Sequence, residues 1–255
     1  MPTIGGLAIF VAFNIGEFVL LRKDFPTHEL FSVLLASSVI ILTGLIDDIL
    51  ELKPRQKMFG IFVASLVVYF LAGIKVRELS LPFLGHIQLG WWSFPLTIFW
   101  ILALTNAVNL IDGLDGLATG VTLISLVTMG IVGFFFLKCW QHYVPIMCIM
   151  LAACLLGFLP YNFHPAKIFL GDTGALYIGF MISVLSLKGL KNVTFVSLLV
   201  PILILGVPIT DTVYAMIRRK LNKKNISQAD KHHLHHQLMR MGLSHRQTVL
   251  AIYGI

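Results

Sequence analysis

The sequence predicts an all-α protein, a bundle of transmembrane helices that crosses a membrane several times. Hydrophobic residues make up 57% of the 255 residues and charged residues 12%, whereas a soluble domain has about 25% charged residues. The mean hydropathy of +0.88 is too high for one globular core to hide the apolar surface, so lipid is the expected solvent. The three cysteines have neither zinc-ligand spacing nor a disulfide framework and are expected to be buried thiols.

The apolar runs are expected to be helices, because a segment in lipid has to satisfy its own backbone hydrogen bonds. The eight predicted helices are Gly5–Leu21, Leu30–Ile46, Lys57–Gly73, Trp92–Leu110, Leu117–Leu137, Tyr143–Tyr161, Gly174–Leu187 and Val193–Ala215. A ninth is predicted to begin at Gln247, and the segment 74–95 alternates weakly, as a small hairpin does. The whole chain, 1–255, is expected to be one integral membrane domain.

The distribution of Lys and Arg orients this bundle. The connections between successive helices fall alternately on two sides, and 12 of the 19 cationic residues lie on one side, 8 of them in the stretch Arg218–Arg246. The richer side is expected to be cytoplasmic, in a multi-pass protein of the cell membrane. Four polar clusters from four different connections fall on this same side.

Two of these clusters are rich in carboxylates. Asp47 and Asp48 end a predicted helix, where adjacent carboxylates are costly unless they meet cations or a metal ion, and Lys57 lies nearby in sequence. A solvated helix end is the alternative. The second cluster repeats every third residue: Asn106, Asn109, Asp112 and Asp115. Glycines 113 and 116 are expected to break the helix, so that all four side chains reach one cavity.

The other two clusters suit phosphate. Asp172 and Thr173 stand between glycines at the start of an apolar helix, where a plain N-cap is the alternative to a phosphate site. The fourth cluster is HHLHH, at residues 232–236. Zinc is disfavoured there because cysteines and a matching carboxylate pattern are missing. Histidines that donate to phosphate, or a solvated amphipathic helix, fit the surrounding Lys and Arg residues better.

Carboxylates, amides, glycine-rich turns and cations together indicate phosphoryl transfer. Magnesium usually binds through one or two carboxylates plus the phosphates of a substrate. The lipid setting indicates that one reactant is a membrane-borne phosphate.

Taken in order, DDILELKPRQK, NAVNLIDGLDGLA, PAKIFLGDTG and HHLHH resemble the motifs of the polyprenyl-phosphate N-acetylhexosamine-1-phosphate transferases. The resemblance covers nearly the whole chain. The segment HHLHHQLMRMG is more similar to the GlcNAc-1-phosphate branch than to the phospho-MurNAc-pentapeptide branch. The implied reaction joins UDP-GlcNAc to undecaprenyl phosphate, or another polyprenyl phosphate, and releases UMP. It would start a teichoic-acid or O-antigen type of polymer, in an enzyme that is often a homodimer and binds no nucleic acid.

The resemblance also implies roles for individual residues. Catalytic roles are implied for Asp47, Asp48, Lys57, Asp112 and Asp115. The implied cofactor is Mg²⁺, or Mn²⁺ in its place, held by Asp172 together with Asn109 or Asp112. Substrate contacts are implied for Asn106, Asn162, Lys167, Phe169, His232, His233, His235 and His236. Among these, Phe169 should stack on the uracil and Asn162 should hydrogen-bond to it.

Two further expectations concern the lipid and the reaction. Pro201 and Pro208 should bend one helix and open a groove for the polyprenyl chain. Direct in-line attack by the acceptor phosphate is favoured over a two-step route through a phosphorylated Asp112, because a third anion would add repulsion. The family pattern has one more helix before the Pro2-Thr3 motif, so the chain is expected to lack a first helix and part of the last.

Two other functions remain open. A phospho-N-acetylmuramoyl-pentapeptide transferase would differ in the sugar donor. A membrane transporter for an anionic substrate would have broken helices near the middle of the membrane, whereas the polar motifs here lie at helix ends on one side.

Overall fold

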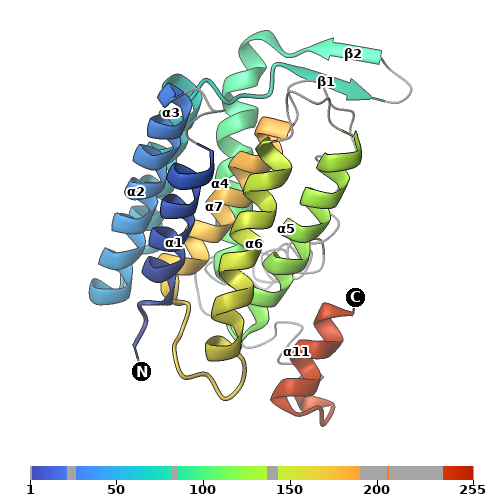
Figure 1. The fold of residues 1–255 in the computed structure, drawn as a ribbon. Coiled ribbons are helices and arrows are strands. Elements are labelled where there is room, and N and C mark those ends of the chain that lie inside the picture. Colours follow the sequence, from blue (N-terminus) through green and yellow to red (C-terminus); the bar gives the residue numbers. More distant parts are fainter. Residues whose placement is uncertain are drawn as a thin grey trace, which may run out of the picture.

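The protein is a bundle of long helices, known from a computed structural model that describes residues 2–21, 27–81, 85–136, 143–189, 206 and 238–254 (Figure 1). Its helices are α1 (Gly5–Leu20), α2 (Thr27–Leu50), α3 (Pro54–Phe70), α4 (Ser93–Ile111), α5 (Leu117–Phe136), α6 (Tyr143–Asn162), α7 (Gly171–Gly189) and α11 (His245–Tyr253). A short hairpin, β1 (Glu78–Leu81) and β2 (Gly85–Gln88), and a 3-10 turn, η1 (Gly90–Trp92), connect α3 to α4.

Helix lengths and composition confirm the predicted all-α membrane fold. Within the described residues, four helical segments are long and apolar enough to cross a membrane: Thr27–Leu50, Gly90–Ile111, Leu117–Phe135 and Tyr143–Asn162. Helix α1 is apolar but shorter. Large apolar side chains such as Phe31, Phe59 and Leu156 are exposed on the outside of the bundle, where lipid would cover them.

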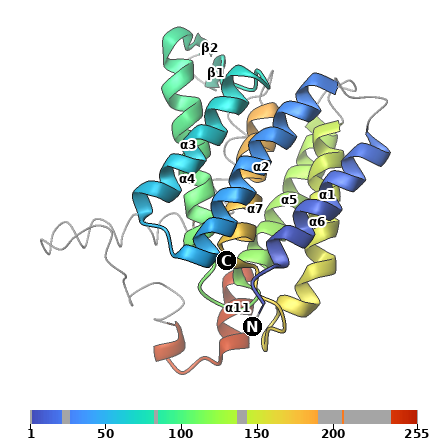
Figure 2. The ribbon, with the colours of Figure 1, turned by 90° about the vertical axis from the view of Figure 1, so that its left-hand side faces the viewer.

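Helix α7 lies inside the bundle and packs against α1, α2 and α4 (Figures 1 and 2). Nearly all of its residues between Thr173 and Lys188 are buried, including the large Tyr177 and Phe180. Protein rather than lipid surrounds this helix, which explains why it tolerates the buried hydroxyls of Ser183 and Ser186. These hydroxyls donate back to carbonyls of their own helix, at 2.7 Å each.

The predicted hairpin is confirmed. Strands β1 and β2 are antiparallel, with Glu78 opposite Gln88 and Leu81 opposite Gly85. The hairpin lies at one end of the bundle, and the N-terminal segment and α11 lie at the other (Figures 1 and 2). The adjoining Trp91 and Trp92 are 96% and 73% exposed, as aromatic residues at a membrane–water interface are.

The predicted helix bounds are accurate to a few residues. Helix α3 begins earlier than expected because Pro54 suits a first helical position. Helix α11 begins at His245 rather than Gln247, because Ser244 caps it and accepts a hydrogen bond from the Gln247 backbone nitrogen. The predicted helix 193–215, with the bend expected at Pro201 and Pro208, lies outside the described residues except for position 206.

Close approach of helices fixes the start of α7. A Cβ atom on Gly44 of α2 would lie within 3 Å of backbone atoms of Thr173. A Cβ atom on Gly6 of α1 would also lie within 3 Å of backbone atoms, those of Thr173 and Gly174. Small residues at such crossings let two backbones approach within a membrane.

We predict that Gly44→Ala destabilises the protein. The added methyl group would press on backbone atoms, and overpacking of this kind costs about 1–3 kcal/mol. Thermal unfolding in detergent should show a lower midpoint. The matched control is Gly157→Ala, since a Cβ atom at Gly157 would meet nothing within 4 Å. Equal midpoints for the two variants would contradict the close packing of α2 on α7.

Candidate active site

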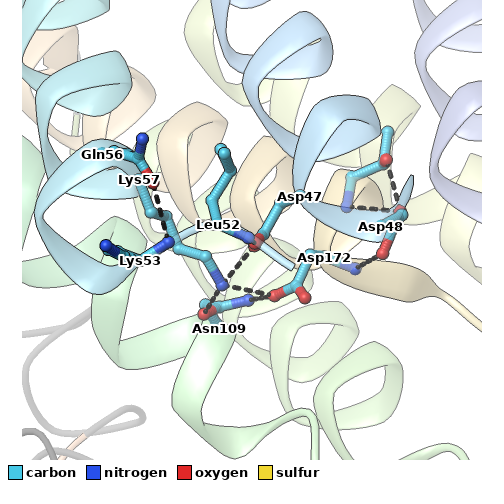
Figure 3. A network of polar contacts seen from close by, with 9 residues as sticks. Asp47, Asp48, Leu52, Lys53, Gln56, Lys57, Asn109 and Asp172 are labelled. Atoms are coloured by element: carbon cyan, nitrogen blue, oxygen red, sulfur yellow. Dashed lines mark hydrogen bonds and ion pairs between the residues drawn. The ribbon is translucent and has the colours of Figure 1, made fainter. Parts of the chain in front are cut away.

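The ammonium group of Lys57 is at the centre of a polar cluster (Figure 3). It forms an ion pair with Asp47 and lies 2.9 Å from Asp172 Oδ1 and 3.3 Å from Asn109 Oδ1. The Asn109 amide also donates to Asp172 Oδ1. Four helices, α2, α3, α4 and α7, thus meet in one network, at the end of the bundle away from the hairpin.

Asp47 is the buried member of this network. Its side chain is 4% exposed, and its Oδ1 accepts a hydrogen bond of 2.9 Å from the Leu52 backbone nitrogen. A buried carboxylate needs a counter-charge, and Lys57 supplies it. Asp47 therefore holds Lys57 and the turn between α2 and α3.

Asp48 points the other way and caps α7 (Figure 3). Its Oδ1 accepts from the Asp172 backbone nitrogen at 2.8 Å, and its Oδ2 accepts from the Thr173 backbone nitrogen at 3.2 Å and hydroxyl at 2.6 Å. A carboxylate at a helix N-terminus satisfies free N–H groups and favours the helix dipole. The alternative of a plain N-cap at Asp172 does not hold, because Asp172 lies inside the first turn of α7 and its side chain contacts Lys57 and Asn109.

A cavity of about 280 Å³ opens beside this cluster. Its lining joins the phosphate-type and nucleotide-type motifs: Thr3, Asp48, Asn109, Asp112, Gly113, Leu114, Asp115, Asn162, Phe169, Leu170, Gly171 and Asp172. Gly171 has a positive φ of 71°, and a Cβ there would collide with Asp48 Oδ2 and Thr3 oxygen atoms. The glycine is therefore required for Asp48 to reach α7.

Negative charge is concentrated around the cavity. Burial, followed by the carboxylates of Asp172, Asp48 and Asp115, raises the pKa of Asp112 to about 7. Such a group would ionise more easily beside a cation. Oxygen donors from carboxylates and an amide are the ligand type that Mg²⁺ prefers, so these residues fit a magnesium ion.

An amide and an aromatic ring also line the cavity. Asn162 is 2% exposed; its Oδ1 accepts from Thr119 at 2.7 Å and its Nδ2 donates to the Ile168 carbonyl at 3.1 Å. Phe169 is half-buried, and its backbone nitrogen donates to the Pro2 carbonyl at 3.1 Å. An aromatic ring and an oriented amide are groups that can bind a planar, hydrogen-bonding base.

Asp115 is tied to the loop that follows α6. Its Oδ2 lies 2.9 Å from His164 Nδ1 and accepts from the Ala166 backbone nitrogen at 3.2 Å. Among the described residues, Asp115, His164 and His245 are close enough to hold a metal ion, with ligand atoms within 4.8 Å of one another. The two imidazoles are stacked, however, at 4.2 Å and 23°, so their in-plane lone pairs do not converge on one ion.

Most of the predicted site residues meet here, but two do not. Asp47, Asp48, Lys57, Asp112, Asp115, Asn109, Asn162, Phe169 and Asp172 belong to the cluster or line the cavity. Asn106 and Lys167 do not line the cavity: Asn106 is three residues, nearly a full helical turn, before Asn109 on α4, and Lys167 is exposed. The four histidines 232, 233, 235 and 236 lie outside the described residues.

Three residues that support the site were not predicted from the sequence. Thr119 orients Asn162, while His164 and His245 support Asp115. Thr119 is an ordinary buried threonine of α5, so its spacing carries no sequence signal. Tertiary pairing alone brings it to Asn162.

The molecule is a multi-pass membrane protein with a polar cavity at the end of its helix bundle. Residues 30–190 match the model of glycosyl transferase family 4. A Bacillus subtilis protein named as a probable undecaprenyl-phosphate N-acetylglucosaminyl 1-phosphate transferase is 46% identical, over 100% of this chain and 70% of its own length. The decaprenyl-phosphate N-acetylglucosaminephosphotransferase of Mycolicibacterium smegmatis is 34% identical, over 99% and 68%.

A third relative belongs to the other branch. The phospho-N-acetylmuramoyl-pentapeptide-transferase of Clostridium botulinum, strain Eklund 17B, is 35% identical over 91% of this chain and 72% of its own length. The chain belongs to glycosyl transferase family 4, which confirms the resemblance to polyprenyl-phosphate hexosamine-1-phosphate transferases that its four motifs indicate.

We predict that Lys57→Met destabilises the folded protein strongly. The change would leave Asp47 buried without its counter-charge, which costs about 3–5 kcal/mol when a buried pair is broken. Thermal unfolding in detergent should show a large loss that the double variant Asp47→Asn, Lys57→Met partly recovers. Arg55→Met, an exposed cation of the same helix, is the control. Equal unfolding midpoints for Lys57→Met and Arg55→Met would show that the ion pair is not structural.

Proposed function

We propose that the protein transfers GlcNAc-1-phosphate from UDP-GlcNAc to a polyprenyl phosphate such as undecaprenyl phosphate, with release of UMP. The main support is a cavity whose lining combines the carboxylates of Asp112 and Asp172 with the amide of Asn162 and the ring of Phe169. This combination of groups suits a donor that carries both a diphosphate and a base. The names of the Bacillus and Mycolicibacterium relatives agree with this donor and acceptor.

Asn162 and Phe169 would bind the uracil base. Because Thr119 holds Asn162 Oδ1 and the Ile168 carbonyl takes one amide hydrogen, the second amide hydrogen remains to donate to a base carbonyl. Phe169 would stack on the ring. The backbone bonds of the N-terminal segment to Phe169 and Leu170 hold this wall in place.

The cavity would also hold Mg²⁺, or Mn²⁺ in its place. Asp172 with Asn109 or Asp112 would be the ligands, since all three line the cavity. When bound, the ion would neutralise charge on the donor diphosphate. Lys57 supplies a fixed positive charge beside Asp172 and would strengthen the same effect.

The transfer itself would be a direct displacement. An oxygen of the acceptor phosphate forms a bond to the β-phosphorus of UDP-GlcNAc, and the bond from that phosphorus to the bridging oxygen breaks, so that UMP leaves. The acceptor is a phosphate monoester with a second pKa near 6 and is already largely ionised at neutral pH. Asp47 and Asp48, which hold Lys57 and α7, therefore need not act as strong bases.

We place the cavity on the cytoplasmic side of the cell membrane. It opens at the end of the bundle that carries Lys53, Arg55 and Lys57, as the excess of cations on cytoplasmic loops favours. UDP-sugars would reach it there, and a role in teichoic-acid or O-antigen synthesis and a homodimer remain part of this proposal. A transporter is disfavoured because the cavity lies at helix ends rather than near the middle of the bundle.

A pentapeptide-bearing donor is the second candidate, supported by the Clostridium relative. The deciding experiment supplies membranes that contain the protein with undecaprenyl phosphate and either labelled UDP-GlcNAc or labelled UDP-MurNAc-pentapeptide. We expect a labelled polyprenyl diphosphate and UMP from UDP-GlcNAc. Lipid product from the pentapeptide donor alone would replace the proposal with the second candidate, and product from neither would reject both.

We predict that Asp172→Asn lowers turnover by roughly a hundredfold or more, the scale of losing one preorganised electrostatic contact. The activity of the unchanged protein should disappear with EDTA and return with Mg²⁺. Glu51→Gln, an exposed carboxylate at the same end of α2, should leave turnover nearly unchanged. Comparable turnover in Asp172→Asn and the unchanged protein, with both correctly inserted, would remove Asp172 from the cation site.

A further inference from the structure

Helix α11 supports two segments that line the cavity, without lining it itself. It packs on α5 and contacts two separate walls, the 112–116 turn that carries Asp112 and Asp115 and the 162–170 loop that carries Asn162 and Phe169. The motifs that define the site do not include any residue of this helix.

The contact with the turn is made by Tyr253. Its hydroxyl donates to the Gly116 carbonyl, at a residue whose φ is +79°. Its ring fills the space beside Gly120, where a Cβ atom would overlap the ring carbons and the hydroxyl. Gly116 in the turn and Gly120 on α5 thus leave the space that the Tyr253 side chain fills.

The contact with the loop is made by the first two residues of α11. Arg246 Nε donates to the His164 carbonyl at 3.0 Å, and the His245 ring stacks on the His164 ring at 4.2 Å. His164 in turn binds Asp115 Oδ2 through its Nδ1 at 2.9 Å. Each of the three segments, α11, the loop and the turn, therefore contacts the other two, next to Asp115.

Burial indicates that this docking is a packed interface. Thr248 and Val249 are fully buried and Ile252 is 8% exposed. Val249 and Ile252 belong to the main apolar core of the bundle. Since the helix is anchored by its apolar face, the Tyr253 hydroxyl is held at a fixed place against the turn.

We propose that Tyr253 is a positioning residue for the donor nucleotide: it fixes the 112–116 turn against the 162–170 loop, whose Asn162 and Phe169 would bind the base. The inference rests on the proposed function insofar as the ligand is a uridine nucleotide. Loss of the hydroxyl would leave the Gly116 carbonyl without this donor and would loosen the turn. Lys57, Asn109 and Asp172 would keep their own contacts, and Asp112 at the start of the turn would stay hydrogen-bonded to the Asn109 carbonyl of α4. The effect therefore falls on donor binding rather than on the transfer step.

The test compares Tyr253→Phe with the unchanged full chain. Calorimetric titration with UMP should show a dissociation constant raised roughly two- to tenfold, the effect of one lost hydrogen bond. The KM for UDP-GlcNAc should rise by the same factor, while kcat and the KM for undecaprenyl phosphate stay within about twofold. A merely structural role would instead lower the unfolding midpoint and kcat together.

Two further variants complete the design. Tyr69→Phe removes a hydroxyl at the hairpin end of α3 and should leave UMP binding unchanged. Gly120→Ala should push the Tyr253 ring away from its seat and weaken UMP binding at least as much as Tyr253→Phe does. Should Gly120→Ala fail to fold, Tyr253→Phe still decides the question.

The outcomes separate this inference from the proposed function. If the unchanged protein binds UMP but transfers no sugar phosphate, the proposed function is wrong. The UMP titrations of Tyr253→Phe still test whether Tyr253 positions the nucleotide. Unchanged UMP affinity and donor KM in Tyr253→Phe would overturn the inference even if the enzyme is active. No UMP binding by the unchanged protein would overturn it as well.

Discussion

Capping of the α7 N-terminus by Asp48 is the contact that organises the site. Helix α7 is enclosed by other helices, so its first N–H groups cannot rely on bulk water. Asp48 satisfies two of them, and glycines on α1 and α2 let the backbones come close enough. This capping brings Asp172, in the first turn of α7, next to Lys57 and Asn109.

The same charges serve stability and chemistry. Lys57 has to neutralise the buried Asp47 and also lies against Asp172. Burial, and after it the neighbouring carboxylates of Asp172, Asp48 and Asp115, raises the pKa of Asp112 beside the cavity. A site with surplus negative charge in the folded protein is one that a divalent cation would stabilise.

The helices and much of the site could be predicted from the sequence. The helices follow from local runs of apolar residues, and the site follows from the alternation of the connections between the two ends of the bundle. Apolar runs identify the helices, and the parity of the connections places Asp47, Asp112 and Asp172 at one end of the bundle. The separate roles of Asp47 and Asp48 could not be predicted, because Asp48 caps a helix more than 120 residues further along the chain. Tyr253 and Thr119 likewise act through tertiary contacts without any spacing rule.

We propose above that Asp172, in the first turn of α7, helps to hold a divalent cation beside the donor diphosphate. Electron–nuclear double resonance of protein loaded with Mn²⁺ and UDP-GlcNAc measures this directly, through hyperfine coupling between Mn²⁺ and phosphorus-31. The account predicts phosphorus coupling in the unchanged protein and its loss in Asp172→Asn. Bound Mn²⁺ without phosphorus coupling, or coupling that persists unchanged in Asp172→Asn, would contradict it.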